Sequence, residues 1–194
     1  MHDRAARREE LLAAADVVVQ RDGAAASMAA IATEAGITKP ILYRHFGDKG
    51  GLYAALAERH TDRLLDLLVD ALTAGGPPKA RVRRTIDAYL SAIEDEPQVY
   101  RFLVRSEEAV PTPVRGFIFR VQDLLAAGIT HELHLGDHDP RSMIWAAGIV
   151  GMVQAAGDWW LDTAPGDPGA GVTRDQLGGH LTDLLWGAYS GATA

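Results

Sequence analysis

The sequence predicts an all-α protein in two parts, with about nine helices in 194 residues. Apolar residues recur at three- and four-residue spacing along most of the chain, which is typical of helices with one buried face. Gly and Pro clusters interrupt this pattern at helix-length intervals, and no long stretch alternates polar with apolar residues as a strand would. We therefore expect a three-helix N-terminal domain, residues 1–50, followed by a C-terminal helical bundle, residues 51–194.

The first expected helix covers residues 3–21. Its apolar residues have the spacing of one buried face and are Leu11, Leu12, Ala15, Val18 and Val19. Arg4, Arg7 and Arg8 lie at its start, where the helix dipole disfavours cations. A contact with phosphates or with a minor groove would explain them, and a solvated, frayed terminus is the alternative.

Two short helices follow, joined by a tight turn. Ser27 is a good N-cap for the first, and Gly36 supplies the turn. Thr38 is a good N-cap for the second, with Pro40 in its first turn, where a missing N–H costs little. The spacing predicts inward-facing apolar residues, namely Met28, Ile31, Ala32 and Ala35 on the first helix and Ile41, Leu42 and Phe46 on the second.

The outer side of the second short helix carries hydroxyl, basic and aromatic groups. We name this surface the reading face and define it as Thr38, Lys39, Pro40, Tyr43, Arg44 and His45. Two short helices, a tight turn and a polar second helix make the layout of a helix-turn-helix motif, whose second helix enters the major groove of DNA. The sequence therefore predicts a DNA-binding domain.

This segment resembles the DNA-binding region of the TetR family of transcriptional regulators. The matching positions have the family's spacing and are Ile31, Ala32, Ala35, Gly36, Ile37, Thr38, Leu42, Tyr43, His45, Phe46 and Lys49. The resemblance implies DNA contacts from the reading face and from Lys49, which lies at the start of the next helix. It covers the N-terminal third directly, and the remainder agrees with the family in length and helical layout.

Each position of the reading face has a chemical role and an alternative. Lys39 and Arg44 carry donors that reach guanine O6 and N7, and Pro40 can press against a thymine methyl group. Tyr43 and His45 would each contact a phosphate. Alternatively, the Tyr43 ring packs on the preceding helix and His45 is a capped core histidine. Thr38 could act as a helix cap alone or in addition, and Ser27 would offer a phosphate contact at a helix N-terminus.

The net charge of −7 is unevenly distributed along the chain. Residues 1–60 hold eight Lys and Arg against eight Asp and Glu, whereas residues 61–194 hold eleven against eighteen. The acidity therefore lies outside the predicted DNA-binding domain. A modest basic face on an acidic body suits a specific regulator better than a nonspecific DNA coat.

A long helix is expected from Asp48, its N-cap, to the GGPP segment at 75–78. Gly50 and Gly51 lie in its first turn, and each costs about 1 kcal/mol relative to Ala inside a helix. They form either a hinge that lets the reading face tilt when a ligand binds, or a frayed first turn without a role.

Beyond this point we expect helices at residues 79–95, 97–104, 114–135, 141–163 and 173–189, with a loop at 164–171. Their aromatic inner faces could enclose a cavity for an apolar or aromatic ligand. The candidate lining residues, which could equally be plain core, are Tyr100, Phe102, Phe117, Trp145, Met152 and Trp159.

The last two expected helices are rich in small residues and apolar on more than one face. Close helix packing would use both properties, and the resemblance implies that this pair meets its symmetry mate in a four-helix dimer interface. The alternative is ordinary core within one chain. A lone helix-turn-helix usually needs a second half-site for tight binding, which favours a homodimer.

Enzymatic chemistry finds little support. The chain has no phosphate-binding glycine loop, no nucleophile elbow and no cysteine, so we expect no catalytic residue and no cofactor. One polar cluster could hold a metal, although its spacing is not HExxH and a polar helix end with a solvated loop is the favoured explanation; it comprises His131, Glu132, His134, Asp137, His138 and Asp139. No signal peptide or membrane anchor is visible, which suits a cytoplasmic protein.

Together these patterns predict a ligand-responsive transcriptional regulator. It would bind a palindromic operator as a homodimer and act as a repressor that a small apolar or aromatic effector releases from DNA. A metal-responsive regulator that uses the 131–139 cluster is one alternative. A helical enzyme or adaptor with a vestigial helix-turn-helix is another.

Overall fold

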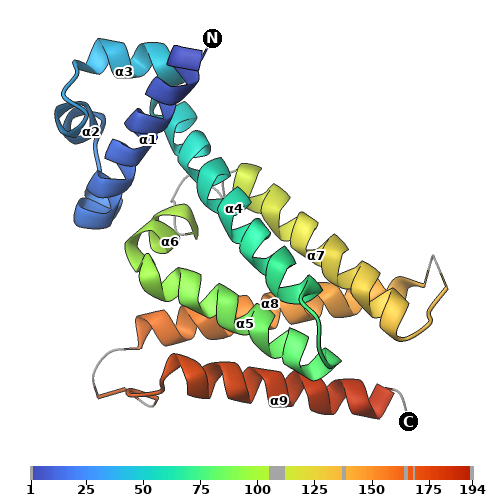
Figure 1. Ribbon diagram of the computed structural model, residues 1–194. Helices are drawn as coiled ribbons and strands as arrows, with labels where there is room; N and C mark the ends of the chain where they lie inside the picture. The colour runs from blue at the N-terminus through green and yellow to red at the C-terminus, as the bar shows by residue number, and fades with distance from the viewer. Residues whose placement is uncertain (1, 105–111, 137–138, 164–165, 168, 193–194) are drawn as a thin grey trace. The chain divides into compact units, whose positions relative to one another are not determined.

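The computed structural model describes residues 2–104, 112–136, 139–163, 166–167 and 169–192 (Figure 1). In these residues the chain is all-helical, as predicted, with one short 3-10 helix, η1 (Gly23–Ala25), and nine α-helices. The α-helices are α1 (His2–Asp22), α2 (Met28–Glu34), α3 (Lys39–Phe46), α4 (Lys49–Thr73), α5 (Pro78–Asp95), α6 (Pro97–Val104), α7 (Thr112–Glu132), α8 (Pro140–Asp162) and α9 (Arg174–Ala192). Within this described part of the chain, no helix has the length and hydropathy needed to cross a membrane.

The chain forms two compact units that do not coincide with a single cut in the sequence. The first unit combines Met1–Arg63 with Glu96–Gly116, and the second combines Leu64–Asp95 with Phe117–Ala194. The helix α4 therefore contributes to both units, and α6 belongs with the N-terminal helices rather than with its neighbours in sequence. The expected division of the chain at residue 50, into a DNA-binding domain and a domain for ligand binding and dimerisation, stays a prediction.

In the first unit, α1 packs against α2, η1 and α6, and α2 packs against α3. The fully buried side chains are those that the helical spacing predicts, including Leu11, Leu12, Val18, Val19, Ile31, Leu42, Leu52 and Leu56. Tyr53 of α4 contacts two other parts of this core, Ala26 and Phe102. Its hydroxyl donates to the backbone oxygen of Ala26 at 3.1 Å, and its ring meets Phe102 edge-on, with ring centroids 4.5 Å apart.

A half-buried polar cluster also joins three parts of the first unit. His60 of α4 places Nε2 2.7 Å from Asp16 Oδ1 on α1 and Nδ1 3.3 Å from an oxygen of Glu96, which precedes α6. Arg59 lies 3.4 Å from the other oxygen of Asp16. These contacts connect α1, α4 and the start of α6.

In the second unit, α5 packs along α9 and also contacts α8 (Figure 1). Arg83 of α5 donates hydrogen bonds to Asp87 and to Asp175 of α9, and the bond to Asp87 is the main reason that the pKa of Arg83 is raised. Gly178 allows the close approach of α9, because a Cβ there would lie 2.5 Å from Asp87 Oδ1. Some small residues of the last two helices therefore serve packing within one chain.

The helix α7 begins and ends earlier than the sequence pattern suggests. Pro113, expected in the preceding loop, lies in its first turn, where proline is tolerated. Its regular part ends at Glu132, because His134 adopts a left-handed φ of 51°. The Leu135 N–H then donates to the oxygen of Thr130 at 3.0 Å, which closes the helix as a Schellman motif. A non-glycine residue in this position is uncommon and was not predicted.

Candidate DNA-binding interface

Ser27 and Gly36 act in the helix-turn-helix as the sequence predicts. Ser27 begins α2, and its hydroxyl accepts the Ala30 N–H at 3.2 Å. At the other end Gly36 has φ of 63°, and the Ile37 N–H donates to the oxygen of Ala32 at 2.9 Å. This is again a Schellman motif, here with the preferred glycine. The turn therefore directs the chain into α3 without strain.

The helix α3 has one buried side and one exposed side. Leu42 is fully buried, and Ile41 and Phe46 are half-buried. Five members of the reading face are exposed, namely Thr38, Lys39, Pro40, Tyr43 and Arg44. The structure thus brings these five side chains to solvent on the outer side of the second helix.

Tyr43 and His45 differ in their exposure. Tyr43 is 42% exposed, so its ring is not a core residue of the domain. His45 is half-buried, and its ring centroid lies 6.4 Å from that of Phe46. The phosphate contact proposed for Tyr43 is therefore sterically open, whereas His45 has only part of its surface available.

Thr38 occupies the N-cap position without using its side chain. Its backbone is extended, with φ of −91° and ψ of 152°, but its hydroxyl makes no capping hydrogen bond. The N–H groups of Ile41 and Leu42 donate instead to the backbone oxygen of Thr38, at 3.0 and 3.3 Å. The exposed hydroxyl at the N-terminus of α3 therefore has no role in closing the helix, and it remains available to a ligand.

Lys49 and Ser27, the two predicted contacts outside the reading face, are both exposed. Lys49 is the first residue of α4, and its Nζ lies 5.0 Å from the centroid of the Tyr53 ring. Asp48 caps this helix as predicted, because its Oδ1 accepts the Gly51 N–H at 2.7 Å. The cation of Lys49 thus has a defined position beside the end of α3.

Two arginines near the start of α1 have partners within the described residues. Arg7 pairs with Glu10 at 2.5 Å. The guanidinium carbon of Arg8 lies 5.2 Å from the centroid of the Phe46 ring. Both residues lie within α1, and a contact of either arginine with DNA stays a prediction. The side chain of Arg4 lies outside the described residues.

At the other end of α1, the exposed Arg21 pairs with two carboxylates. It donates to Asp22 at 2.8 Å and reaches Glu34 of α2 at 3.3 Å. The hydrogen bond between Arg21 and Asp22 raises the pKa of the guanidinium and lowers the pKa of the carboxyl group. This cation therefore holds α1 to α2 and is not part of the reading face.

The predicted ligand-lining residues are divided between the two units. Tyr100 and Phe102 belong to the first unit, and Phe117, Trp145, Met152 and Trp159 belong to the second. Five of the six are half-buried, but Trp159 is 47% exposed and lies over Gly169, where an added Cβ would sit 2.4 Å from its ring. Their assignment to a ligand cavity stays a prediction.

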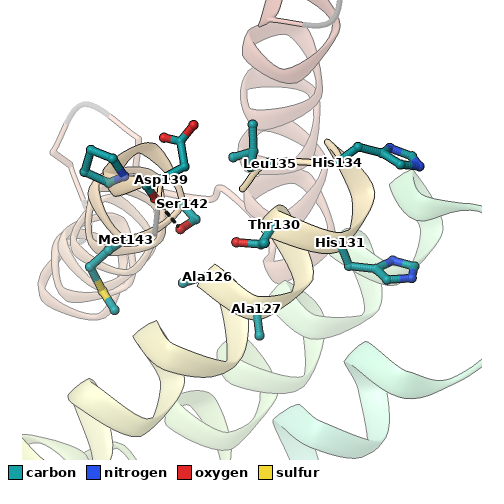
Figure 2. A pocket seen from close by; sticks show the side chains of 10 residues that line it. Ala126, Ala127, Thr130, His131, His134, Leu135, Asp139, Ser142 and Met143 are labelled. Atoms are coloured by element: carbon teal, nitrogen blue, oxygen red, sulfur yellow. Dashed lines mark hydrogen bonds between the residues drawn. The ribbon is translucent and has the colours of Figure 1, made fainter. Parts of the chain in front are cut away.

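A different depression lies between the end of α7 and the start of α8, with a volume of about 740 Å³. It is lined by Ala126, Ala127, Thr130, His131, His134, Leu135, Asp139, Pro140, Ser142 and Met143. Figure 2 shows that Thr130 points toward Ser142, whereas the rings of His131 and His134 extend away from it on the opposite side. None of the six predicted ligand-lining residues belongs to this surface.

The predicted metal cluster is only partly described. Asp139 caps α8 and binds Arg141, and these hydrogen bonds lower the pKa of its carboxyl group. Asp137 and His138 lie outside the described residues. Elsewhere in the described chain, no group of three or more suitable side chains could hold a metal ion. A metal-responsive role for residues 131–139 stays a prediction.

Comparison with known families and proteins agrees with this architecture. Residues 11–56 match the family "Bacterial regulatory proteins, tetR family", and residues 67–194 match "Tetracyclin repressor-like, C-terminal domain". The HTH-type transcriptional activator FasR of Mycolicibacterium smegmatis is 33% identical over 95% of this chain and 83% of its own length. An uncharacterized HTH-type transcriptional regulator of Mycobacterium tuberculosis is 31% identical over 95% of this chain and 78% of its own.

Solved structures show the same fold. A tetR-family transcriptional regulator from Streptomyces coelicolor superposes with a TM-score of 0.79 at 24% identity, covering 98% of this chain and 84% of that one. A TetR-like transcriptional regulator from Rhodococcus gives 0.68 at 26% identity, covering 95% and 96%. The chain belongs to the TetR family, and it is a DNA-binding transcriptional regulator rather than an enzyme.

Proposed function

We propose that the protein binds a palindromic operator as a homodimer and that a small apolar or aromatic effector releases it. The observation that carries this proposal is the exposed outer side of α3, which a capped and strain-free turn presents at the surface. A recognition helix of this kind reads one half-site, and two copies about 34 to 36 Å apart read successive major grooves on one side of a duplex. In this scheme residues 1–50 bind DNA and residues 51–194 bind the effector and the second copy.

Individual roles follow from side-chain chemistry. Lys39 and Arg44 would donate to guanine O6 and N7, and Pro40 would contact a thymine methyl group. Contacts from Thr38, Tyr43, His45, Lys49 and Ser27 would fall on phosphates, where they fix the register but carry no sequence information.

The homodimer is supported by apolar side chains that the second unit leaves exposed. Ile144 of α8 is 63% exposed and Leu184 of α9 is 61% exposed. Gly148, Gly151 and Gly187 have open space where a Cβ would point, unlike Gly178. An exposed apolar surface with small residues is suited to close packing against a second copy.

Effector release would be a shift between two populations of the dimer. One conformation has the half-site spacing that the operator requires, and the other does not. An effector that binds the second conformation more tightly lowers the affinity for the operator, by at most the ratio of its affinities for the two conformations. The half-buried aromatic residues Phe117 and Trp145 support an apolar or aromatic ligand in the second unit.

Repression and activation are both candidates for the effect of the protein on transcription. Release from DNA by an effector suits a repressor in the cytoplasm, which is our first choice. Activation is the second, because FasR of Mycolicibacterium smegmatis, a transcriptional activator, is 33% identical to this chain. Deletion of the gene separates them, since loss of a repressor raises transcription from the bound promoter and loss of an activator lowers it.

Fluorescence anisotropy with duplex DNA from upstream of the protein's own gene tests the proposal. We expect salt-dependent binding with a preference over unrelated DNA. Replacing Arg44 or Lys39 by Ala should weaken operator binding by about 1–3 kcal/mol and relax specificity at one base position. Arg63, an exposed arginine of α4, is the matched control. Equal binding of operator and unrelated duplex by the wild-type protein would contradict the proposal.

A further inference from the structure

We propose that Arg8 is a positioning residue for the recognition helix and acts through the ring of Phe46. Arg8 lies on α1, outside the helix-turn-helix, and its guanidinium carbon is 5.2 Å from the ring centroid of Phe46, the last residue of α3. This distance is within the range of a cation–π interaction, which a planar guanidinium forms well with an aromatic face.

The packing of α3 explains why such a contact would matter. The helix packs mainly on α2, and Leu42 is its fully buried anchor. Phe46 lies one turn further on and is only half-buried. Directly after it the chain turns at Gly47, which has φ of 81°. The C-terminal end of α3 is thus held by the Phe46 ring and by what covers that ring.

The neighbouring charges separate Arg8 from the other arginines. Arg7, the adjacent residue, is paired with Glu10. Within the described residues Arg8 has no carboxylate within ion-pair distance, so the ring is the partner that fixes its side chain. The electron-rich face of Phe46 attracts the guanidinium of Arg8. The contact connects α1 to the end of α3 through side chains.

A positioning role differs measurably from a phosphate contact. Each phosphate contact that a protein loses reduces the slope of log affinity against log salt concentration by about 0.9. A residue that only orients α3 changes the affinity for the operator and leaves this slope unchanged. The inference rests on the proposed use of α3 in DNA binding, so its test also needs a measurement without DNA.

In the absence of DNA, hydrogen–deuterium exchange of the full-length protein reports on α3 directly. We expect Arg8→Met to speed exchange of the backbone N–H groups in the last turn of α3, while those of α2 are unchanged. Arg7→Met is the matched control and should leave α3 as in the wild type. Unchanged exchange in α3 of Arg8→Met would overturn the inference, whether or not an operator has been found.

With the upstream duplex as probe, a double-mutant cycle tests the route through Phe46. We expect Arg8→Met and Phe46→Leu each to weaken binding about two- to five-fold, and the double variant to be no weaker than either, at an unchanged salt slope. If Phe46→Leu does not fold, Phe46→Tyr replaces it and should bind like the wild type, since the ring face is kept. A salt slope reduced by about 0.9 in Arg8→Met alone would identify a phosphate contact instead. Absence of binding by the wild type would contradict the proposed operator and leave the exchange result to decide on Arg8.

Discussion

Gly51 lies at the junction of α3 and α4, where the backbone leaves no room for a Cβ atom. A Cβ at Gly51 would lie 2.0 Å from the backbone oxygen of Phe46, whereas one at Gly50 would lie 3.3 Å from a carboxylate oxygen of Asp48. The first contact is with backbone, whereas the second requires the Asp48 side chain to shift by only a few tenths of an ångström. The two adjacent glycines, which the sequence presents as equivalent, therefore have different constraints.

We predict that Gly51→Ala destabilises the protein and that Gly50→Ala does not. Overpacking of this kind costs about 1–3 kcal/mol, whereas Ala at an ordinary helical position gains up to about 1 kcal/mol over Gly. In a thermal melt the first variant should lose several degrees, at about 2–4 °C per kcal/mol for a chain of this size. Equal melting temperatures for both variants would instead support a frayed first turn.

At the same scale, the caps of the helix-turn-helix were predictable from the sequence, but the contact between Arg8 and Phe46 was not. Capping residues such as Ser27 and Gly36 act on backbone groups a few positions away, so local sequence contains the information. The contact between Arg8 and Phe46 joins residues 38 positions apart, and its distance depends on how α1 packs. No spacing rule could have found it, although the three arginines near the start of α1 marked the place.

At the scale of elements, the end of α7 carries a local strain that substitution can relieve. His134 has the left-handed backbone of a Schellman motif, where residues other than glycine cost about 1–2 kcal/mol. We predict that His134→Gly raises the melting temperature by about 1–4 °C, after the entropy lost by glycine on folding is deducted. His134→Ala is the control, because it removes the imidazole but keeps the strain. Equal melting temperatures of the two variants would show that the change in stability comes from the imidazole ring and not from the backbone conformation.

The start of α8 supplies a prediction about pH. Hydrogen bonds from the Arg141 side chain and backbone hold the pKa of Asp139 below its ordinary value of 3.8. A lowered pKa in the folded state means that the stabilisation is complete above the ordinary value and is lost as pH falls through the folded value.

Asp139→Asn should therefore be less stable than the wild type near pH 6, and the difference should shrink below about pH 4. Urea unfolding of both proteins at several pH values measures this difference, and the other carboxyl groups affect both proteins alike. A constant difference from neutral to acid pH would mean that the charge of Asp139 does not stabilise α8.

Helix positions were largely predictable because apolar spacing and Pro or Gly punctuation are local signals. The deviations at α7 have a physical cause. His134 ends the helix with a left-handed φ, although the usual residue for that conformation is glycine. Pro113 lies in the first turn, where a backbone N–H would have no helical partner, so its missing N–H costs nothing. The grouping of α6 with the N-terminal helices was not predictable, since it depends on contacts such as that between Tyr53 of α4 and Phe102 of α6.

At the scale of the whole molecule, the apolar side chains left exposed on the last two helices yield a prediction about assembly. We expect Leu184→Glu to convert the proposed dimer to monomer, because it places a charge where an apolar partner surface would pack. Light scattering after size-exclusion chromatography measures the mass. Leu67→Glu on α4 is the control, since Leu67 is also an exposed leucine of the second unit, at 45%.

Loss of the dimer should also reduce operator affinity by orders of magnitude, because one recognition helix then binds alone. A monomeric wild type, or a dimer in both variants, would show that α9 is not the interface. The family supplied the expectation of this interface, and exposure on the structure identifies which side chains to test.

The N-terminus of α3 also affects the free energy of DNA binding. Thr38 closes the helix with its backbone alone, and Pro40 has no N–H to offer. An operator phosphate that accepts from the Thr38 hydroxyl and the Lys39 N–H would do what a capping side chain does in other helices. Part of the binding energy would then come from capping a helix N-terminus that has no side-chain cap in the free protein. Recognition of DNA and completion of secondary structure would be a single event.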